Sequence, residues 1–524
     1  MHRLRRVQGK VHMKSLLRKP RLLSRYLSKY HALPIQLKTS FWFLVCAVLQ
    51  KGIQAITTPI FTRIMNPADY GLFGVFTSWQ GIVAVVISLN LYCGVYIQGL
   101  VKFDDIRERY TSSIEGLTLT LILLWLAVYL ATRAFWNRIF SLTTVQMIAM
   151  FATIWGSSVF SFWATEQRVD FKYSKLVALT LAVSLIQPIV GIVAVLHASD
   201  KVTAKILSVT IVDLLAYTWL FVYHMRRGKV FFSRRIWKYA LCFNIPLVPH
   251  YLSTIILASS DRIMIEKMTG ATNAGIYNLA YYVALIMTLL STALTQTIEP
   301  WLYKKIKAKD FTSFPKVAYP SFTIIAGANI LLMLFAPEVV RLFAPPAYHD
   351  AIWIIPPVAM SAYFMFTYSF FAVFEFYYEK TSLIAFATLV GAVLNIILNY
   401  IFIGKFGYYA AGYTTLVCYV IYSAMHYIFM RHICNRYLQG VKPYSLRVIL
   451  AITFVFVALG FAILSLYRLP SARLALATLL LAITFCLRRK IFSAVSKVIS
   501  VKNNNIKESN PCQNTILMKE TYKF

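Results

Sequence analysis

Lys51 lies at the middle of an apolar segment, residues 39–62, and is followed by Gln54 and Thr58. Spacings of three and seven residues place these polar side chains on one face of a helix. A lysine at the centre of a membrane-spanning helix costs about 2.5–3.5 kcal/mol on insertion scales, so it normally faces a cavity or an anionic partner. We expect this face to line a cavity in which Lys51 balances the charge of an anionic ligand. The alternative is an ion pair with an acid such as Asp213 that only holds two helices together.

Three acidic residues are candidates for binding a coupling ion, either a proton or sodium: Asp213, Glu299 and Glu375. Asp213 is the deepest of them, near the centre of its apolar segment. The sequence does not separate ion binding by Asp213 from pairing with Lys51. Glu299 and Glu375 lie near the ends of their segments, where simple contact with water is the alternative explanation.

A second polar face is expected in the apolar segment 274–299. Thr292, Thr295 and Glu299 repeat the spacing of the Lys51 face, so they also lie on one side of a helix. We expect Thr292 and Thr295 to line the same cavity as Lys51.

The segment 236–260 is the most interrupted, because it contains Pro246 and Pro249 next to His250. Prolines inside a membrane-spanning helix free backbone carbonyls and permit bending. We therefore expect this segment to act as a gate.

Asp261 and Arg262 follow that segment, and we expect them in a loop at the outer mouth of the molecule. Solvation at a helix end is sufficient to explain them there. As a functional alternative, Arg262 could guide an anionic head group or close a latch with an acid such as Asp69.

The elements that must position these residues follow from composition. The chain has 524 residues, of which 59% are apolar and 14% charged, far more apolar side chain than a water-exposed surface tolerates. About 20 apolar residues are needed to cross a bilayer as a helix. Windows of this kind predict an all-α polytopic membrane protein with about fourteen spans, at 39–62, 70–98, 111–132, 142–164, 173–197, 202–224, 236–260, 274–299, 317–338, 351–378, 381–403, 408–431, 445–466 and 470–488.

The distribution of Lys and Arg predicts the orientation. Most of the 53 basic residues fall in alternate loops and in the two termini, and basic loops stay in the cytoplasm. We therefore expect both termini to be cytoplasmic. The net charge of +34 is then explained by topology and anionic lipid head groups, and no nucleic-acid partner is required. The seven cysteines form neither a disulfide ladder nor CxxC metal spacing, and we expect no metal and no cofactor.

The chain also contains an internal repeat. When the sequence is aligned with itself so that Gly71 matches Gly275, Arg63 matches Lys267. The same alignment matches the first six apolar segments with the next six. An even number of spans returns the second unit in the same orientation, so the two halves should be related by an axis along the membrane normal. The expected divisions are a basic N-terminal segment, two six-helix bundles, two additional helices and a cytoplasmic tail, at 1–38, 39–231, 232–435, 436–490 and 491–524.

The repeated motifs carry a family resemblance. "TRIMNPADYGLF" at 62–73 and "SSDRIMIEKMTGATNAGIYNLAYY" at 259–282 resemble the Wzx-type polysaccharide flippases of the MOP superfamily, which are relatives of the MATE exporters and of the lipid II flippase. The resemblance implies two six-helix bundles in a MATE-like V around a central cavity. It also implies transfer of an undecaprenyl-pyrophosphate-linked oligosaccharide, as in O-antigen synthesis, from the cytoplasmic to the periplasmic leaflet of a bacterial inner membrane. A polysaccharide polymerase and a chain-length regulator would be partner proteins.

Two other functions stay open at this point. A MATE-type multidrug/ion antiporter fits the hydropathy, but an unpaired Lys51 would repel cationic drugs. A polytopic polysaccharide polymerase would need an extramembrane platform for its chemistry, and the predicted outer loops are short. No nucleotide-binding G-x-x-x-x-G-K-[ST] loop, HExxH motif or Asp-x-Asp pair occurs, so we expect no enzyme.

Overall fold

The computed structural model describes residues 35–486, and every regular element in that part of the chain is helical. Short 3-10 turns cover Asp104–Ile106, Ile245–Leu247 and Pro346–Trp353. The α-helices are α3 (Ile35–Ile64), α4 (Pro67–Ser88), α5 (Val95–Lys102), α6 (Arg107–Ala131), α7 (Arg133–Phe140), α8 (Thr144–Val169), α9 (Tyr173–His197), α10 (Lys201–Gly228), α11 (Arg234–Asn244), α12 (Val248–Thr269), α13 (Ala271–Lys307), α14 (Phe314–Leu334), α15 (Ala336–Phe343), α16 (Ile355–Tyr377), α17 (Thr381–Phe406), α18 (Ala410–Tyr437), α19 (Leu446–Leu466) and α20 (Pro470–Cys486).

Twelve helical segments in the described part of the chain are long and apolar enough to cross a membrane. The other two expected spans correspond to α18, a 28-residue helix that packs on α16 and α17, and to α20, whose apolar stretch is shorter. The prediction of an all-α polytopic membrane protein is confirmed. The expected terminal segments, 1–38 and 491–524, lie almost wholly outside the described residues.

Local sequence explains where several helices begin. Asn66 caps α4 by accepting a hydrogen bond from the backbone N–H of Asp69, and Pro67 occupies the first helical position, where its missing N–H costs nothing. Thr143 and Gln146 form a reciprocal capping box at the start of α8. These caps fix the short turns between long helices.

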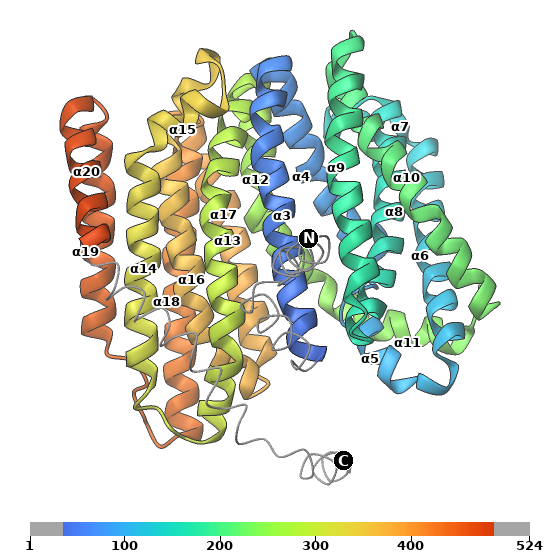
Figure 1. Ribbon diagram of the computed structural model, residues 1–524. Coiled ribbons are helices and arrows are strands. Elements are labelled where there is room, and N and C mark those ends of the chain that lie inside the picture. The colour runs from blue at the N-terminus through green and yellow to red at the C-terminus, as the bar shows by residue number, and fades with distance from the viewer. Residues whose placement is uncertain (1–34, 487–524) are drawn as a thin grey trace, which may run out of the picture.

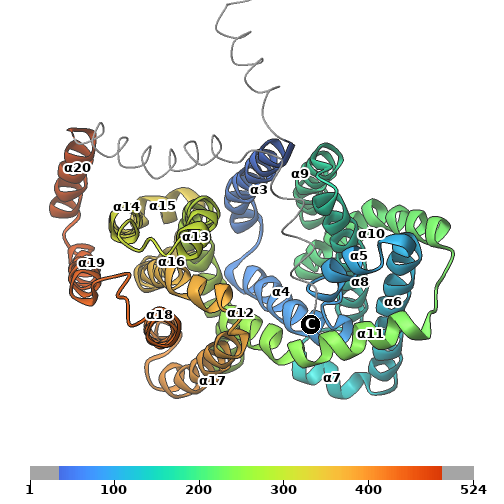
Figure 2. The same ribbon diagram turned by 90° about the horizontal axis from the view of Figure 1, so that it is seen from below.

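The long helices form two groups, as Figure 1 and Figure 2 show. Helices α6, α8, α9 and α10 pack together on one side, and α13, α14, α16, α17 and α18 on the other, with α19 and α20 at the outer edge of the second group. Helices α3, α4 and α12 lie between the groups. We call the two ends of the molecule the α15 end, at the top of Figure 1, and the α11 end, at the bottom.

The two halves of the chain approach each other closely where α4 of the first half crosses α13 of the second. A Cβ atom added at Gly71 would collide with the carbonyl oxygen of Ala271, and one added at Gly275 would collide with the carbonyl oxygen of Pro67. Only glycine permits backbones to approach this closely. The shift that aligns Gly71 with Gly275 also aligns Pro67 with Ala271, so each helix presents the same surface to the other. This reciprocal contact is what two units related by a twofold axis would make.

The seventh expected span begins later in the chain than the sequence suggested. The chain turns at Ile245–Leu247, with Pro246 in the turn and Pro249 in the first turn of α12. Helix α11 before this break lies across the lower face of the molecule (Figure 2). Its Ile236 and Ala240 are buried against the helix bundle, not exposed to lipid. These apolar residues extended the hydropathy window toward the N-terminus, so the expected span 236–260 begins and ends earlier in the chain than α12.

Helix α20 is tied to α15 by an ion pair. Arg473 donates a hydrogen bond to Oε2 of Glu338 at 2.6 Å, and a second, shorter one to Oε1. These hydrogen bonds hold the pKa of Glu338 below its usual range. The edge helix is therefore fixed at the α15 end.

Candidate functional site

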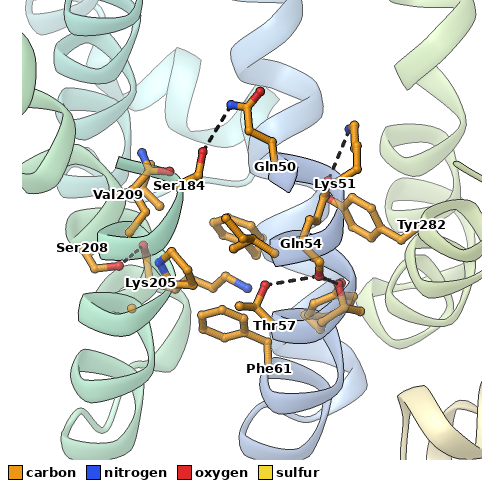
Figure 3. Close-up of a pocket in the computed structure, with 17 residues that line it drawn as sticks. Gln50, Lys51, Gln54, Thr57, Phe61, Ser184, Lys205, Ser208, Val209 and Tyr282 are labelled. Atoms are coloured by element: carbon orange, nitrogen blue, oxygen red, sulfur yellow. Dashed lines mark hydrogen bonds between the residues drawn. The ribbon is translucent and has the colours of Figure 1, made fainter. Parts of the chain in front are cut away.

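A polar cavity of about 360 Å³ lies between α3, α9 and α10, with α4 and α13 contributing to its wall. The face of α3 that carries Lys51, Gln54 and Thr58 lines it. Nζ of Lys51 donates a hydrogen bond of 3.3 Å to Oε1 of Gln54, and the hydroxyl of Thr58 donates to the backbone carbonyl of Gln54 at 2.8 Å. Figure 3 shows α3 in the middle of the site, between α10 and the helix that carries Tyr282. The expected Lys51 face thus lies on a cavity wall.

A second cation, Lys205, lines the same cavity and was not singled out from the sequence. Its side chain extends from α10 toward α3 (Figure 3) and is only 6% exposed. Its ammonium group lies 3.5 Å from the ring centroid of Phe61, 4.2 Å from that of Phe73 and 5.2 Å from that of Tyr70. Aromatic faces attract a cation without neutralising it. Within residues 35–486, Lys205 forms no ion pair.

The position of Lys205 in the sequence concealed its role. It lies one turn inside α10, close to where hydropathy ends the span, and lysines there usually reach the membrane surface. Its depth becomes visible only when the three aromatic rings of α3 and α4 are placed around it. The signal available in the sequence was the second lysine of the largely apolar string "KVTAKILSVTIV" at 201–212.

Asp213 is not the partner of Lys51 in this structure. Oδ1 of Asp213 accepts a hydrogen bond of 2.7 Å from the side-chain amide of Gln187, and Gln187 lines the cavity. The ion-pair alternative for Lys51 is therefore wrong for this conformation. Asp213 stays a candidate ion site that reaches the cavity through Gln187.

The second expected polar face is not brought to this cavity. Thr292 is exposed and donates to the carbonyl of Thr288, Thr295 is half-buried, and Glu299 accepts a hydrogen bond from Tyr303 at 3.3 Å. Helix α13 instead contributes Tyr282, almost three turns closer to the start of the helix. Among the cavity-lining residues, neither Thr292 nor Thr295 appears.

The position of Glu375 in the sequence left open that this residue contacts water at a helix end. The structure shows that it does not. It is fully buried, and its Oε1 lies 2.7 Å from Nδ1 of His426 on α18. Hydropathy places a residue along a helix but does not show which side of that helix is covered. Helix α16 is covered by α13, α14 and α18, so its end is not open to water.

Asp261 and Arg262 also lie elsewhere than expected. Because α12 extends to Thr269, both are buried inside the helix and not in a loop. Asp261 accepts hydrogen bonds from Tyr277, Asn399 and Thr415 at 2.6–2.8 Å. Arg262 donates to the carbonyl of Ala258 and stacks over the ring of Tyr281 at 4.3 Å.

The alternative of a latch between Arg262 and Asp69 is not formed in this conformation, since no ion pair among the described residues joins them, and the structure shows different contacts at the α15 end. Arg63, the last basic residue of α3, donates to the carbonyl of Leu342 in α15 at 2.9 Å. Lys267, the residue that aligns with Arg63 in the repeat, donates to the hydroxyl of Ser141 directly after α7. We call Arg63 and Lys267 the reciprocal latch, because each joins one half to the short helix of the other.

The predicted gate residues lie at the α12 break. Pro246 lies in the turn between α11 and α12, and Pro249 lies in the first turn of α12. Nδ1 of His250 lies 2.9 Å from the hydroxyl of Thr388 on α17. The turn connects a surface helix to a membrane helix. Its gating role stays a prediction.

The fold and the cavity together define a class. The protein is polytopic and helical, its two helix groups border a cavity lined by lysines, and its two halves are joined at the α15 end. These features are those of a membrane transporter. Residues 36–305 match the family described as "Polysaccharide biosynthesis protein", and the chain belongs to this family. The resemblance to Wzx-type flippases of the MOP superfamily is confirmed at this level.

Individual proteins support the same assignment. The Lsg locus putative protein 1 of Haemophilus influenzae is 22% identical over 388 residues, which is 68% of this chain and 89% of that protein. A structure of the lipid II flippase MurJ in an inward closed conformation matches with a TM-score of 0.63 at 12% identity, covering 85% of this chain and 99% of that one. An inward-facing multidrug resistance MATE family transporter of the MOP superfamily matches with a TM-score of 0.56 at 14% identity, covering 75% of this chain and 96% of that one. At these identities the structural matches show a shared fold.

Proposed function

We propose that the protein is a flippase that moves an undecaprenyl-pyrophosphate-linked oligosaccharide from the cytoplasmic to the periplasmic leaflet of a bacterial inner membrane. The observation that carries this proposal is the pair of cations, Lys51 and Lys205, on the wall of one cavity with no acid paired to either among the described residues. A lipid diphosphate is the anionic group that a membrane protein of polysaccharide synthesis would have to move.

The chemistry of the substrate fits the surroundings of these lysines. Gln50, Gln54, Thr57 and Ser184 add amide and hydroxyl groups to the wall, which can bind sugar hydroxyls or phosphate oxygens. The polyprenyl tail needs no polar cavity and can stay in the lipid. Two unpaired lysines disfavour the multidrug antiporter alternative, because cationic drugs would be repelled.

Alternating access supplies the transport step. The α15 end is joined by the reciprocal latch and by the crossing of α4 and α13, so in this conformation the two halves meet at that end. We propose that the units 39–231 and 232–435 rock about this contact, and that the α11 end is cytoplasmic, together with both termini. A polysaccharide polymerase and a chain-length regulator are the proposed partner proteins on the opposite side.

A direct transport assay tests this function. Purified protein in proteoliposomes that contain an undecaprenyl-pyrophosphate-linked oligosaccharide should expose the glycan to an external glycosidase at a rate above that of empty liposomes. If the glycan stays protected while a fluorescent cationic drug is moved in the same vesicles, the antiporter alternative replaces the flippase.

The proposed orientation makes a separate prediction. Reporter fusions placed after Lys201 and after Lys405 should both be active on the periplasmic side, because both positions belong to turns at the α15 end. A fusion after Lys307, at the opposite end of α13, serves as the cytoplasmic control. Cytoplasmic activity of either test fusion would overturn the assigned orientation.

The reciprocal latch leads to a further testable prediction. Arg63→Ala and Lys267→Ala should each weaken closure of the α15 end by about 0.5–1.5 kcal/mol, the net value of one hydrogen bond, and the double variant should lower transport more than either. Closure can be measured by the labelling of a cysteine at Met65, which is 2% exposed, with a water-soluble maleimide. Arg341→Ala, which removes an exposed arginine of α15 itself, is the matched control. Equal labelling in the double variant and the control would refute the latch.

A further inference from the structure

Three ionisable side chains from three helices meet inside the first helix group. Nδ1 of His224 on α10 lies 2.6 Å from Oε1 of Glu115 on α6, and Nε2 lies 3.2 Å from Oε2 of Glu166 on α8. His224 is 4% exposed and Glu115 is 1% exposed. The second carboxylate oxygen of Glu115 is buried without a hydrogen-bond partner in the described part of the chain. The cavity containing Lys51 and Lys205 does not include this cluster.

The geometry determines how many protons the cluster holds. A neutral imidazole donates from one ring nitrogen and presents a lone pair at the other. Here both nitrogens face carboxylate oxygens, so the second contact is a hydrogen bond only if the ring is doubly protonated or the facing carboxyl carries a proton. In either form, the cluster contains one proton more than a neutral histidine beside two carboxylates.

The second half of the molecule provides an internal comparison. Glu375 of α16 and His426 of α18 form a buried pair at 2.7 Å, and the repeat places α16 on α8 and α18 on α10. Nε2 of His426 has no partner among the described side chains. A neutral histidine is sufficient for that single contact. The first half differs because it adds a second carboxylate.

We propose that Glu115, His224 and Glu166 form a proton-binding site whose occupancy controls the packing of α6, α8 and α10 toward the α11 end. With the proton bound, one imidazole holds both neighbouring helices. Without it, one of the two hydrogen bonds is lost and two carboxylates face a neutral ring, which favours separation. This site lies within the helix group formed by α6, α8, α9 and α10, and it would bind a proton whatever substrate is transported.

The surroundings show where the proton would exchange. The side chain of Glu166 is 15% exposed, more than the other two members, so water reaches the site from that side. The other ionisable groups that face the cluster are Tyr96 of α5, Arg107 of α6 and Asp170 at the end of α8. Arg107 is paired with Asp170 at 2.8 Å, so its charge is shared with that acid.

The helices around the site are already in backbone contact. A Cβ atom at Gly228, one turn beyond His224, would collide with the carbonyl oxygen of Glu108 and with the side chain of Ser112 on α6. A change in the hydrogen bonds of His224 therefore acts on a close helix contact, where a small displacement is measurable.

Histidine nitrogen resonances test the protonation directly. In full-length protein with ¹⁵N-labelled histidine, reconstituted in lipid nanodiscs at neutral pH, His224 should show two protonated ring nitrogens and His426 only one. His224→Gln assigns the signal. Glu166→Gln, at the partly exposed member, should convert His224 to the singly protonated form without loss of folding. A singly protonated His224 in the unmodified protein, together with the absence of any carboxylic-acid C=O infrared band that disappears in Glu115→Gln or Glu166→Gln, would overturn the proposal.

Helix separation tests the consequence. Spin labels at Arg109→Cys and Lys229→Cys, both exposed at the α11 end, should move apart as the pH is raised from about 7 to about 11, because a histidine between two carboxylates loses its proton at a higher pH than an ordinary histidine. His224→Gln should abolish this response, and His197→Gln, an exposed histidine at the other end of α9, should preserve it. A pH response that persists in His224→Gln, or that is absent from the unmodified protein, would overturn the proposal. Neither readout requires transport, so failure of the flippase assay leaves this test intact.

Discussion

Replacing both Lys51 and Lys205 with glutamine is expected to abolish transport of the lipid-linked glycan while the protein still accumulates in the membrane. Hydrogen bonds to a charged group are worth about 1.5–3 kcal/mol each. At about 1.4 kcal/mol per factor of ten, each lysine then contributes about ten- to a hundredfold in binding. The two effects need not add, because both lysines line one cavity. The readout is the fraction of glycan reached by an external glycosidase in proteoliposomes.

Variants that keep, reverse or remove the charge of each lysine separate the effect of charge from the effect of packing. Lys51→Arg should retain much of the transport, whereas Lys51→Glu should abolish it. Lys205→Met keeps the contact with Phe61 and removes only the charge, so it should behave like Lys205→Gln. Lys380→Gln is the matched control, because Lys380 also lies over an aromatic ring, that of Tyr437, but at a loop.

Two outcomes would contradict the substrate role. Normal transport in the double glutamine variant would remove the diphosphate assignment altogether. Recovery of transport when Lys51→Gln is combined with Asp213→Asn would mean that the two residues pair in another conformation, since neutralising both partners then removes the stranded charge.

Gly71→Ala is expected to hold the α15 end open, although alanine is intrinsically the better helix former by about 1 kcal/mol. The added methyl group collides with the carbonyl oxygen of Ala271 across the crossing of α4 and α13. Overpacking of this kind typically costs about 1–3 kcal/mol, which shifts the conformational equilibrium away from the closed end by about ten- to a hundredfold. Transport should fall, and labelling of a cysteine at Met65 should rise.

The chain offers matched controls for this substitution. Gly52→Ala and Gly327→Ala also lie inside helices, but a Cβ atom at either position meets nothing within 4 Å. They should leave labelling unchanged and stabilise the protein slightly. Gly275→Ala should reproduce Gly71→Ala, since its methyl group meets the carbonyl oxygen of Pro67. If Gly71→Ala resembles Gly52→Ala instead, the crossing does not control closure.

The all-helical class and the order of the long helices could be predicted because hydropathy can be read at every position of the sequence, although twelve and not fourteen helices in the described residues are long and apolar enough to cross a membrane. The shift between Gly71 and Gly275 also predicted a twofold relation between the halves. The displaced α12 was missed because α11 is apolar on the side that packs against protein, and a hydropathy window cannot separate that side from one facing lipid.

Pairings between distant residues could not be predicted at all. His224 and Glu115 are 109 positions apart, and Lys205 meets Phe61 only when α10 faces α3 across the cavity. An isolated lysine near the end of an apolar segment indicates surface contact until the rings around it are known. Spacing along one helix, by contrast, is local, and for this reason the face of Lys51, Gln54 and Thr58 was accessible from the sequence.

The crossing of α4 and α13 has a consequence for the origin of the chain. Each helix presents the same surface, centred on Gly71 in one and on Gly275 in the other. Self-complementary contacts of this kind are the interfaces of homodimers with twofold symmetry. A six-helix ancestor could therefore have paired with a second copy of itself in parallel orientation through one glycine. Gene duplication and fusion would then have needed no new interface at this point, only a linker such as α11 to carry the chain from the end of one copy to the beginning of the next.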